Sequence, residues 1–470
     1  MNIKIKALIL TVWCLFLSLT SCNQGGSGNT EEKDEPFYKP GQIELKIQCR
    51  SNADFSYCLY TPSYLEVTKK YPLIIIFDAH ARGKMAINRF KPAAEKYGYI
   101  IVSSNDARNG ISDINPIVNA LWEDVVNRLP VDVSRIYTAG FSGGARIAAS
   151  VAIYKGGVKG VIACGAGMPS PEQQISKRFE YISIVGLNDL NYQELKTLDK
   201  ALVKHNYTSE MLSFNGTHEW PDSQTLSLAV EWLELMAIKS KSIPVNDKLV
   251  RDYSVYYADT INNLIKNGDN YQAYLLYNLI LRDLEGVYDI SDYKKSYQAL
   301  LQNPQIEQFK KIDENLNKEE LDQQQQILDW FKQASFSPLK NEVNKLQKSE
   351  NAGNFLQKHQ VKRLLGFMGM LSFLYSENSL NSQNQDKFKS YMEIYEMLEP
   401  KNSDIQIFKA CQAMMDNQPE KALGYVQTAI DLGFYDVNRL QTLGYFEQLR
   451  VKPEFDILVS KAQENFNKLE

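Results

Sequence analysis

Histidine is rare in this sequence, with four copies in 470 residues: His80, His205, His218 and His359. Cysteine is also scarce, and none of the six forms a C-x-x-C motif or a Cys/His cluster that would bind zinc. We therefore expect no metal site. The formal net charge is −4, so the chain lacks the basic excess that would indicate a nucleic-acid partner.

Long apolar runs are missing as well. The run ALILTVWCLFLSL at 7–19 is too short for a comfortable membrane span, and it follows two lysines, as in a signal peptide. It leads into LTSC at 19–22, which resembles the lipobox of bacterial lipoproteins. That resemblance implies a signal peptide at 1–21 and a lipid on Cys22. The protein would then be anchored on a bacterial membrane outside the cytoplasm, at the outer membrane or the periplasmic face. The alternative is an ordinary signal peptide with a chance cysteine.

The segment after the cleavage site has the composition of a linker. Residues 22–36 are rich in Gly, Asn and acidic residues and show no apolar periodicity, so we expect a flexible tether. Further on, Cys49 and Cys58 flank a short stretch that could be a hairpin. A local disulfide between them would suit an oxidising compartment, but cysteines on neighbouring strands must meet narrow geometric limits, so both alternatives stay open.

Strand-like and helix-like stretches alternate from residue 37 to 242. The continuous apolar run PLIIIFDA at 72–79 is typical of a strand that is buried on both faces. The expected strands are 43–49, 56–61, 72–79, 99–104, 134–140, 158–167, 181–186 and 210–216, and the expected helices are 85–98, 113–129, one from 143, 192–205 and 221–238. This alternation predicts an α/β domain with a doubly wound, mostly parallel sheet covered on both faces.

Residues 243–470 have a different character, with amphipathic stretches rich in Gln, Asn, Lys and Leu and no apolar strands. We expect a separate all-α domain. In its last third the small residues Ala410, Ala422 and Ala429, with Val426, fall at packing positions of a 34-residue tetratricopeptide repeat. Leu443 and Gly444 fall where the next repeat would place its Leu-Gly pair. A nonrepetitive helical bundle is the alternative.

The stretch GFSGG at 140–144 matches the G-x-S-x-G motif. A β-branched strand precedes it and a small-residue helix follows, which is the context in which the motif presents a nucleophile. Gly140 and Gly144 would let the backbone turn sharply while strand and helix pack closely. Ser142 would then project its Oγ from the top of the sheet at a helix N-terminus.

A serine hydroxyl becomes a nucleophile only when a base takes its proton. His218 follows a late strand, at the sheet edge where loops of α/β proteins build sites, so we expect it to be that base. Asp189 follows the preceding strand and would orient the imidazole. His205, near a helix end, and His359, far from the sheet in sequence, are poorer candidates.

An acyl-transfer site also needs donors for the oxyanion. The backbone N–H of Gly143, directly after the nucleophile, is one candidate. The second should come from the loop after strand 72–79, around Ala79 and His80. The His80 side chain could contact substrate, could hold the loop by a hydrogen bond, or could have neither role.

Three segments, GFSGGAR, VGLNDLNY and FNGTHEWP, carry a resemblance that covers about residues 43–235. They resemble bacterial α/β-hydrolases of the polyhydroxybutyrate depolymerase, feruloyl esterase and dienelactone hydrolase-like kind. The resemblance implies Ser142, Asp189 and His218 as the catalytic residues. It also implies a place near the pocket for Trp220, although a packed core residue fits equally. Many relatives have His-Gly-Gly where this chain reads FDAHARGK, so the resemblance does not assign the second oxyanion donor to a residue of this chain.

These features predict a lipid-anchored serine hydrolase that needs no cofactor and cleaves an ester, most simply a carboxylesterase. The connection between the strands at 158–167 and 181–186 is too short for a lid, which suits an ester on a bulky or polymeric substrate. Two alternatives remain. One is a serine peptidase on the same fold. The other is an interaction protein whose repeats bind a protein partner while the hydrolase domain is vestigial.

Overall fold

The alternation of strands and helices expected for residues 37–242 is present in the computed structural model, which describes residues 37–169 and 178–469. Within those residues eight strands form one sheet. They are β1 (Ile43–Gln48), β2 (Ser56–Tyr60), β3 (Tyr71–Asp78), β4 (Ile100–Ser104), β5 (Val131–Phe141), β6 (Gly160–Cys164), β7 (Glu180–Gly186) and β8 (Ser209–Phe214). The predicted signal peptide, Cys22 and the tether lie outside the described residues.

The strand order is β1-β2-β4-β3-β5-β6-β7-β8. Only the β1–β2 and β2–β4 pairs are antiparallel, and every other pair is parallel. From β3 the chain first adds β4 on one side and then β5 to β8 on the other, so the direction of strand addition reverses at β3. The sheet is therefore doubly wound, as expected. Because parallel strands end at one edge, the loops after β3, β5, β7 and β8 gather there.

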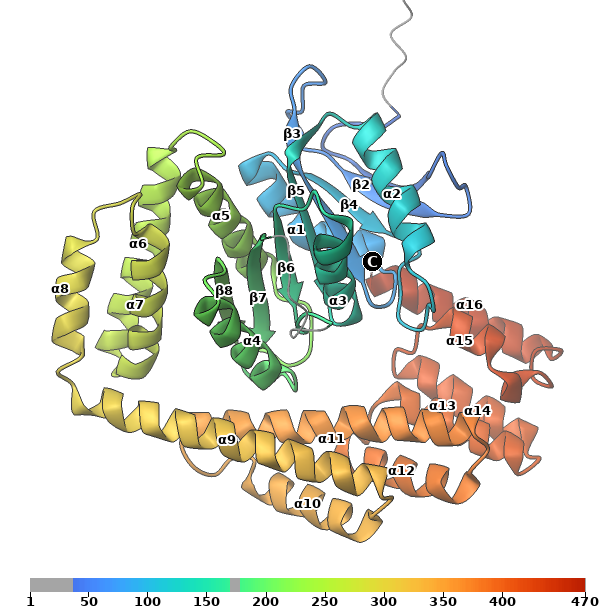
Figure 1. Cartoon of the computed structure of the whole chain (residues 1–470). Helices are drawn as coiled ribbons and strands as arrows, with labels where there is room; N and C mark the ends of the chain where they lie inside the picture. Colours follow the sequence, from blue (N-terminus) through green and yellow to red (C-terminus); the bar gives the residue numbers. More distant parts are fainter. Residues whose placement is uncertain (1–36, 170–177, 470) are drawn as a thin grey trace, which may run out of the picture. The chain divides into compact units, whose positions relative to one another are not determined.

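Helices cover both faces of the sheet (Figure 1). They are α1 (Gly83–Tyr97), α2 (Asn115–Arg128), α3 (Gly143–Ser150) with a π-helical turn at Val151–Lys155, α4 (Tyr192–Lys204) and α5 (Ser223–Lys239). α1 and α5 pack on one face, and α2, α3 and α4 on the other. The fold class of an α/β-hydrolase sheet is therefore confirmed by strand order and helix placement.

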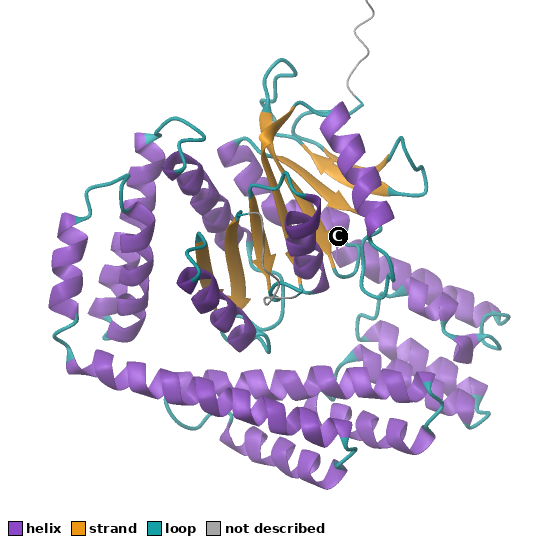
Figure 2. Ribbon diagram, in the orientation of Figure 1, coloured by secondary structure: helices purple, strands orange, loops and turns teal. Residues whose placement is uncertain are grey.

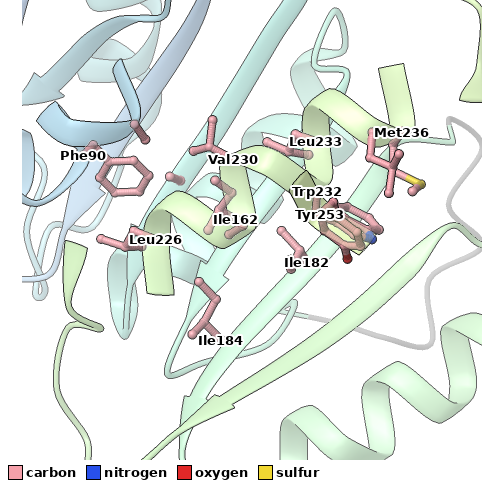
Figure 3. Packing of buried hydrophobic residues seen from close by; sticks show 14 of the residues in the cluster. Phe90, Ile162, Ile182, Ile184, Leu226, Val230, Trp232, Leu233, Met236 and Tyr253 are labelled. Atoms are coloured by element: carbon pink, nitrogen blue, oxygen red, sulfur yellow. The ribbon is translucent and has the colours of Figure 1, made fainter. Parts of the chain in front are cut away.

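The core beneath α5 shows why this arrangement is stable (Figure 3). Ile162, Ile182 and Ile184 point from β6 and β7 towards Leu226 and Val230 of α5, and all five are fully buried. Burying a side chain of this size contributes roughly 1.5–3 kcal/mol. β6 is apolar throughout and β7 is apolar apart from Glu180 and Ser183, which matches this two-sided burial.

Cys49 and Cys58 do not form the disulfide that the sequence left open. Cys58, on β2, belongs to the core on the α1 side, and its thiol donates to the Leu45 carbonyl oxygen at 3.0 Å. Cys49 belongs to the core on the opposite face. Cys49 N–H donates to the Phe55 carbonyl oxygen at 2.9 Å, so Cys49 lies opposite Phe55, three residues before Cys58. Because side chains alternate between the two faces along a strand, the two cysteines lie on opposite faces of the sheet.

From residue 247 the described chain is helical (Figure 2). The helices are α6 (Asp247–Lys266), α7 (Asn270–Leu284), α8 (Ser291–Leu300), α9 (Pro304–Lys332), α10 (Phe336–Ser349), α11 (Phe355–Asn381), α12 (Gln385–Leu398), α13 (Ser403–Met415), α14 (Pro419–Asp431), α15 (Val437–Thr442), a 3₁₀ turn at Gly444–Phe446, and α16 (Pro453–Leu469). α6 and α7 share one core with α5, and the described chain from Tyr38 onward forms one compact unit. No described helix is both long and apolar enough to cross a membrane.

The repeat-like residues lie in the helical pair α13 and α14. Ala410, Ala422, Val426 and Ala429 are all fully buried there, as small residues at a close helix contact would be. The expected next Leu-Gly pair differs, because α15 ends at Thr442 and the 3₁₀ turn begins at Gly444. The tetratricopeptide repeat therefore stays a prediction.

Candidate active site

Ser142 lies on the tight turn between β5 and α3. Its backbone has φ 54° and ψ −120°, a conformation with positive φ that residues other than glycine rarely adopt. Its N–H donates to the Cys164 carbonyl oxygen of the neighbouring strand at 2.8 Å. The side chain is thereby presented at the N-terminus of α3, as the motif predicts.

Two glycines make this turn possible by letting backbones touch. A Cβ atom on Gly140 would lie 2.2 Å from the carbonyl oxygen of Gly144. A Cβ atom on Gly144 would lie 2.0 Å from the carbonyl oxygen of Phe77 in β3. Both distances are far below van der Waals contact, so neither position accepts a side chain without moving α3 away from the sheet.

The structure brings Ser142, His218 and Asp189 together in a hydrogen-bonded chain. His218 Nε2 lies 2.9 Å from Ser142 Oγ, and His218 Nδ1 lies 3.0 Å from each carboxylate oxygen of Asp189. With the proton on Nδ1, the imidazole donates to Asp189 and accepts from the serine hydroxyl. This tautomer is the one that removes a proton from Oγ.

The acid and the base have different surroundings. The Asp189 side chain is 1% exposed, and Oδ1 also accepts the backbone N–H of Asn191 at 2.8 Å. The His218 side chain is 27% exposed and lies against the Phe141 ring, with centroids 4.9 Å apart. The carboxylate is therefore buried and fixed, whereas the imidazole is partly exposed.

A second buried carboxylate, Asp78, organises the loop after β3. It accepts from Arg82 through Nε and Nη2 at 2.9 Å each, from the His80 backbone N–H at 2.9 Å, and from Trp220 Nε1 at 2.7 Å. Burial alone would raise the pKa of Asp78, but the hydrogen bonds and the charge of Arg82 outweigh it and hold the pKa below its ordinary value. Asp78 is therefore an anion that ties the loop to α1.

Trp220 is 5% exposed, packs against Phe90 and Phe141, and gives its indole N–H to Asp78. It is a packed core residue, the interpretation that fitted equally, and it contacts Phe141, the ring that lies against His218. The physical reason is the buried Asp78 carboxylate, which needs a donor from this side. The sequence signal for Asp78 was an acid at the end of a fully apolar strand, followed four residues later by an arginine.

Of the predicted oxyanion donors, Gly143 and Ala79 could still donate a backbone N–H, whereas the His80 N–H is already used. Gly143 is the first residue of α3, where an N–H has no acceptor within the helix. In the β3 loop, the His80 N–H donates to Asp78, so of the two predicted loop residues only Ala79 is left as a possible donor.

A residue that the sequence analysis missed, Asn109, lies beside Gly143 and Ala79. A Cβ on Gly143 would be 1.9 Å from Asn109 Oδ1 and 3.4 Å from Nδ2, and Asn109 N–H donates to the Ala79 carbonyl oxygen at 2.9 Å.

A cavity of about 630 Å³ opens next to these loops. One wall is made by Ala79, His80 and Asn109, and the other by residues of the C-terminal helical region that include Phe373, Asp404, Tyr435 and Arg439. The His80 ring faces Tyr435 edge-on, with centroids 6.2 Å apart. His80 thus lies on a cavity wall, and the helical region supplies the opposite side.

The two remaining histidines, His205 and His359, differ in their distance from the catalytic groups. His205 is exposed at the end of α4, as expected. His359 is far from the sheet in sequence, yet its Nδ1 is 2.7 Å from Asn188 Oδ1, one residue before Asp189. No local pattern in the sequence indicates this contact, because it depends on how α11 packs.

No protein-family profile and no curated protein matches this sequence. The solved structures that it resembles include S-formylglutathione hydrolase from Staphylococcus aureus (12% identity, 42% of this chain and 98% of that one, TM-score 0.35). An esterase of Pyrobaculum calidifontis (15%, 43% and 87%, TM-score 0.35) and Est1E from Butyrivibrio proteoclasticus (14%, 42% and 98%, TM-score 0.33) are also similar. Each likeness is of low identity and spans about two fifths of this chain, so the chemistry of the site has to be judged from its own geometry.

The turn at Ser142 yields a direct test. Gly144→Ala should lower the free energy of unfolding by about 2 kcal/mol or more and abolish reaction at Ser142, because the added methyl overlaps the Phe77 carbonyl oxygen. Gly424→Ala is the matched control. It lies in α14 with open space around it and should raise stability by about 0.5–1 kcal/mol. Urea unfolding of both variants measures the difference, and equal effects would contradict the close contact.

Proposed function

We propose that this chain is a serine hydrolase that cleaves carboxylic esters. The observation that carries the proposal is the continuous hydrogen-bonded chain from Ser142 Oγ through His218 to buried Asp189, with the serine on a strained turn. A structural serine needs neither the strain nor a correctly oriented imidazole.

The geometry supports a two-step reaction. His218 Nε2 takes the Ser142 proton as Oγ attacks the ester carbonyl carbon, and Asp189 stabilises the imidazolium that forms. The negative charge on the carbonyl oxygen meets the Gly143 N–H. When the C–O bond to the alcohol breaks, His218 returns the proton to the leaving alkoxide and an acyl-enzyme remains. Water then repeats the sequence on the acyl group, which releases the acid and restores Ser142.

We place the larger part of the substrate in the 630 Å³ cavity beside Ala79 and Asn109. A volume of this size is typical of sites for organic ligands. Its lining mixes the aromatic side chains of Phe373 and Tyr435 with amide, hydroxyl and charged groups, Asp404 and Arg439 among the last. This supports an ester whose larger part is polar and bulky better than one with a long alkyl chain.

The central prediction concerns labelling by a fluorophosphonate probe. Wild-type protein from Phe37 onward should become labelled at Ser142, whereas Ser142→Ala and His218→Ala should not. Asp189→Asn should lower the rate about 10³–10⁴-fold because the imidazole loses its orienting anion. His205→Ala is the control, since His205 is exposed on α4 and should label at the wild-type rate.

Folded wild-type protein that fails to react would contradict the proposal and favour the interaction protein with a vestigial site. If labelling occurs but p-nitrophenyl esters are not turned over while peptide substrates are, the enzyme is the peptidase alternative.

We further propose that the Asn109 carboxamide is a second oxyanion donor, acting beside the Gly143 N–H. Asn109→Ala should then lower kcat for p-nitrophenyl acetate by about 10²–10³-fold and change KM little, because the lost bond forms in the transition state. Asn119→Ala, which removes an exposed amide on α2 outside the cavity, should leave kcat within about twofold. An Asn109→Ala enzyme with wild-type kcat would leave Ala79 as the second donor.

We also propose that Cys22 carries a lipid that holds the enzyme on a membrane outside the cytoplasm, on the sequence evidence of LTSC alone. In bacterial cells expressing the full chain, a clickable fatty acid should label wild type and Cys14→Ala, and Cys22→Ala should be unlabelled and leave the membrane fraction. Labelling that survives Cys22→Ala would contradict the anchor.

A further inference from the structure

Two residues on one face of α11 hydrogen-bond to the loop that carries Asp189, and a third lies next to it. This acid loop, Leu187–Asn191, joins β7 to α4. Arg363 Nη1 donates to the Leu187 carbonyl oxygen at 3.0 Å, and His359 Nδ1 donates to Asn188 Oδ1 at 2.7 Å. A Cβ on Gly366 would lie 3.9 Å from Leu190 Cβ. The spacing of four and then three residues places all three on one stripe of the helix.

Arg363 is itself fixed from the other side by α9. Its Nε and Nη2 donate to the two carboxylate oxygens of Glu320 at 2.8 and 2.6 Å. Glu320 is fully buried and the Arg363 side chain is 7% exposed. A bidentate pair of this kind sets the plane of the guanidinium and so aims Nη1 at the acid loop.

The pair is also satisfied on its remaining sides. Glu320 Oε2 accepts from Gln193 Nε2 at 2.8 Å, and the Arg363 guanidinium lies 4.6 Å from the centre of the Tyr192 ring. Both neighbours are in the first turn of α4, directly after the acid loop. Removing an ion pair from water has a desolvation cost, so a buried pair adds little to stability by itself. Because Arg363 is held by Glu320 and donates to the acid loop, the pair indicates a role in positioning that loop.

The inner side of the same loop holds the catalytic groups. Asp189 accepts from His218 Nδ1, and the Asn188 N–H donates to the Gly216 carbonyl oxygen of the histidine loop at 2.9 Å. A displacement of the acid loop would therefore move both Asp189 and the chain that carries His218. Misplacement of catalytic groups by about 1 Å can cost on the order of 10²-fold in rate.

We infer that Arg363, held by Glu320, is a positioning residue that fixes Asp189 for catalysis, so that α9 and α11 are part of the catalytic unit. This inference rests on the proposed serine hydrolase function. It goes beyond that function because it assigns to the helical region a role inside the reaction rather than in binding a partner.

The test is a double-mutant cycle between Arg363 and Asp189 in the mature full-length chain. Arg363→Met should lower kcat for p-nitrophenyl acetate about 10²-fold with little change in KM. Because it acts through Asp189, the double variant with Asp189→Asn should be no more than about threefold slower than Asp189→Asn alone. Arg363→Lys, which keeps the charge but loses the fork, should be intermediate.

Lys196→Met is the matched control for the packing between α4 and α9. Lys196 Nζ binds Asp313 at 2.7 Å across the same pair of helices, but it contacts none of the acid-loop residues named above. It should leave kcat within about threefold. Thermal unfolding identifies variants that fail to fold, and if Arg363→Met is one of them, Arg363→Lys carries the cycle.

A second readout is independent of turnover. The proton between His218 Nδ1 and Asp189 should give a downfield ¹H NMR signal in wild type and Lys196→Met that is lost or weakened in Arg363→Met. Multiplicative rate losses, or an unchanged signal in folded Arg363→Met, would overturn the inference and leave the hydrolase function standing. A wild type that shows the signal but reacts with neither ester nor probe would overturn the proposed function, while the signal still tests the positioning.

Discussion

The active site depends on one close contact, the approach of α3 to β3 and β5 at the turn after the central strand. Gly140 and Gly144 have no Cβ, so carbonyl oxygens occupy the space where side chains would be. This contact holds Ser142 at positive φ and points Oγ away from the sheet. It also places the N–H of Gly143 at the start of α3, so nucleophile and oxyanion donor are set by the same backbone geometry. The strained backbone of Ser142 is maintained because the packed core on both faces of the sheet fixes β5 and α3 in place.

Buried carboxylates then fix the loops around that turn. Asp78 gathers donors from Arg82, His80 and Trp220, and thereby orders the loop after β3. Glu320 orients Arg363, which reaches the loop that carries Asp189. In both cases both oxygens of a buried carboxylate accept hydrogen bonds, as a buried charge requires. Buried polar groups therefore hold the loops of the site in place.

The helical region takes part in the site in two ways. It supplies one wall of the cavity next to Ala79 and Asn109, and it contacts the acid loop through α11. Helices from the C-terminal half of the chain therefore border the site. Substrate selection and the alignment of Asp189 would then both depend on segments more than 150 residues away from the nucleophile in sequence.

The sequence by itself determined the parts that are local or follow from parallel strands. The apolar runs predicted the strands, the G-x-S-x-G stretch predicted the turn, and Asp189 and His218 could be named because loops after parallel strands meet at one edge. Only the tertiary structure decided which polar groups pair across the molecule. In the structure the buried Trp220 donates to Asp78, and Cys49 and Cys58 lie on opposite faces of the sheet. Asn109, His359 and Arg363 lie at the site. These contacts leave no periodic or motif signal, because they arise from the packing of helices against loops far along the chain.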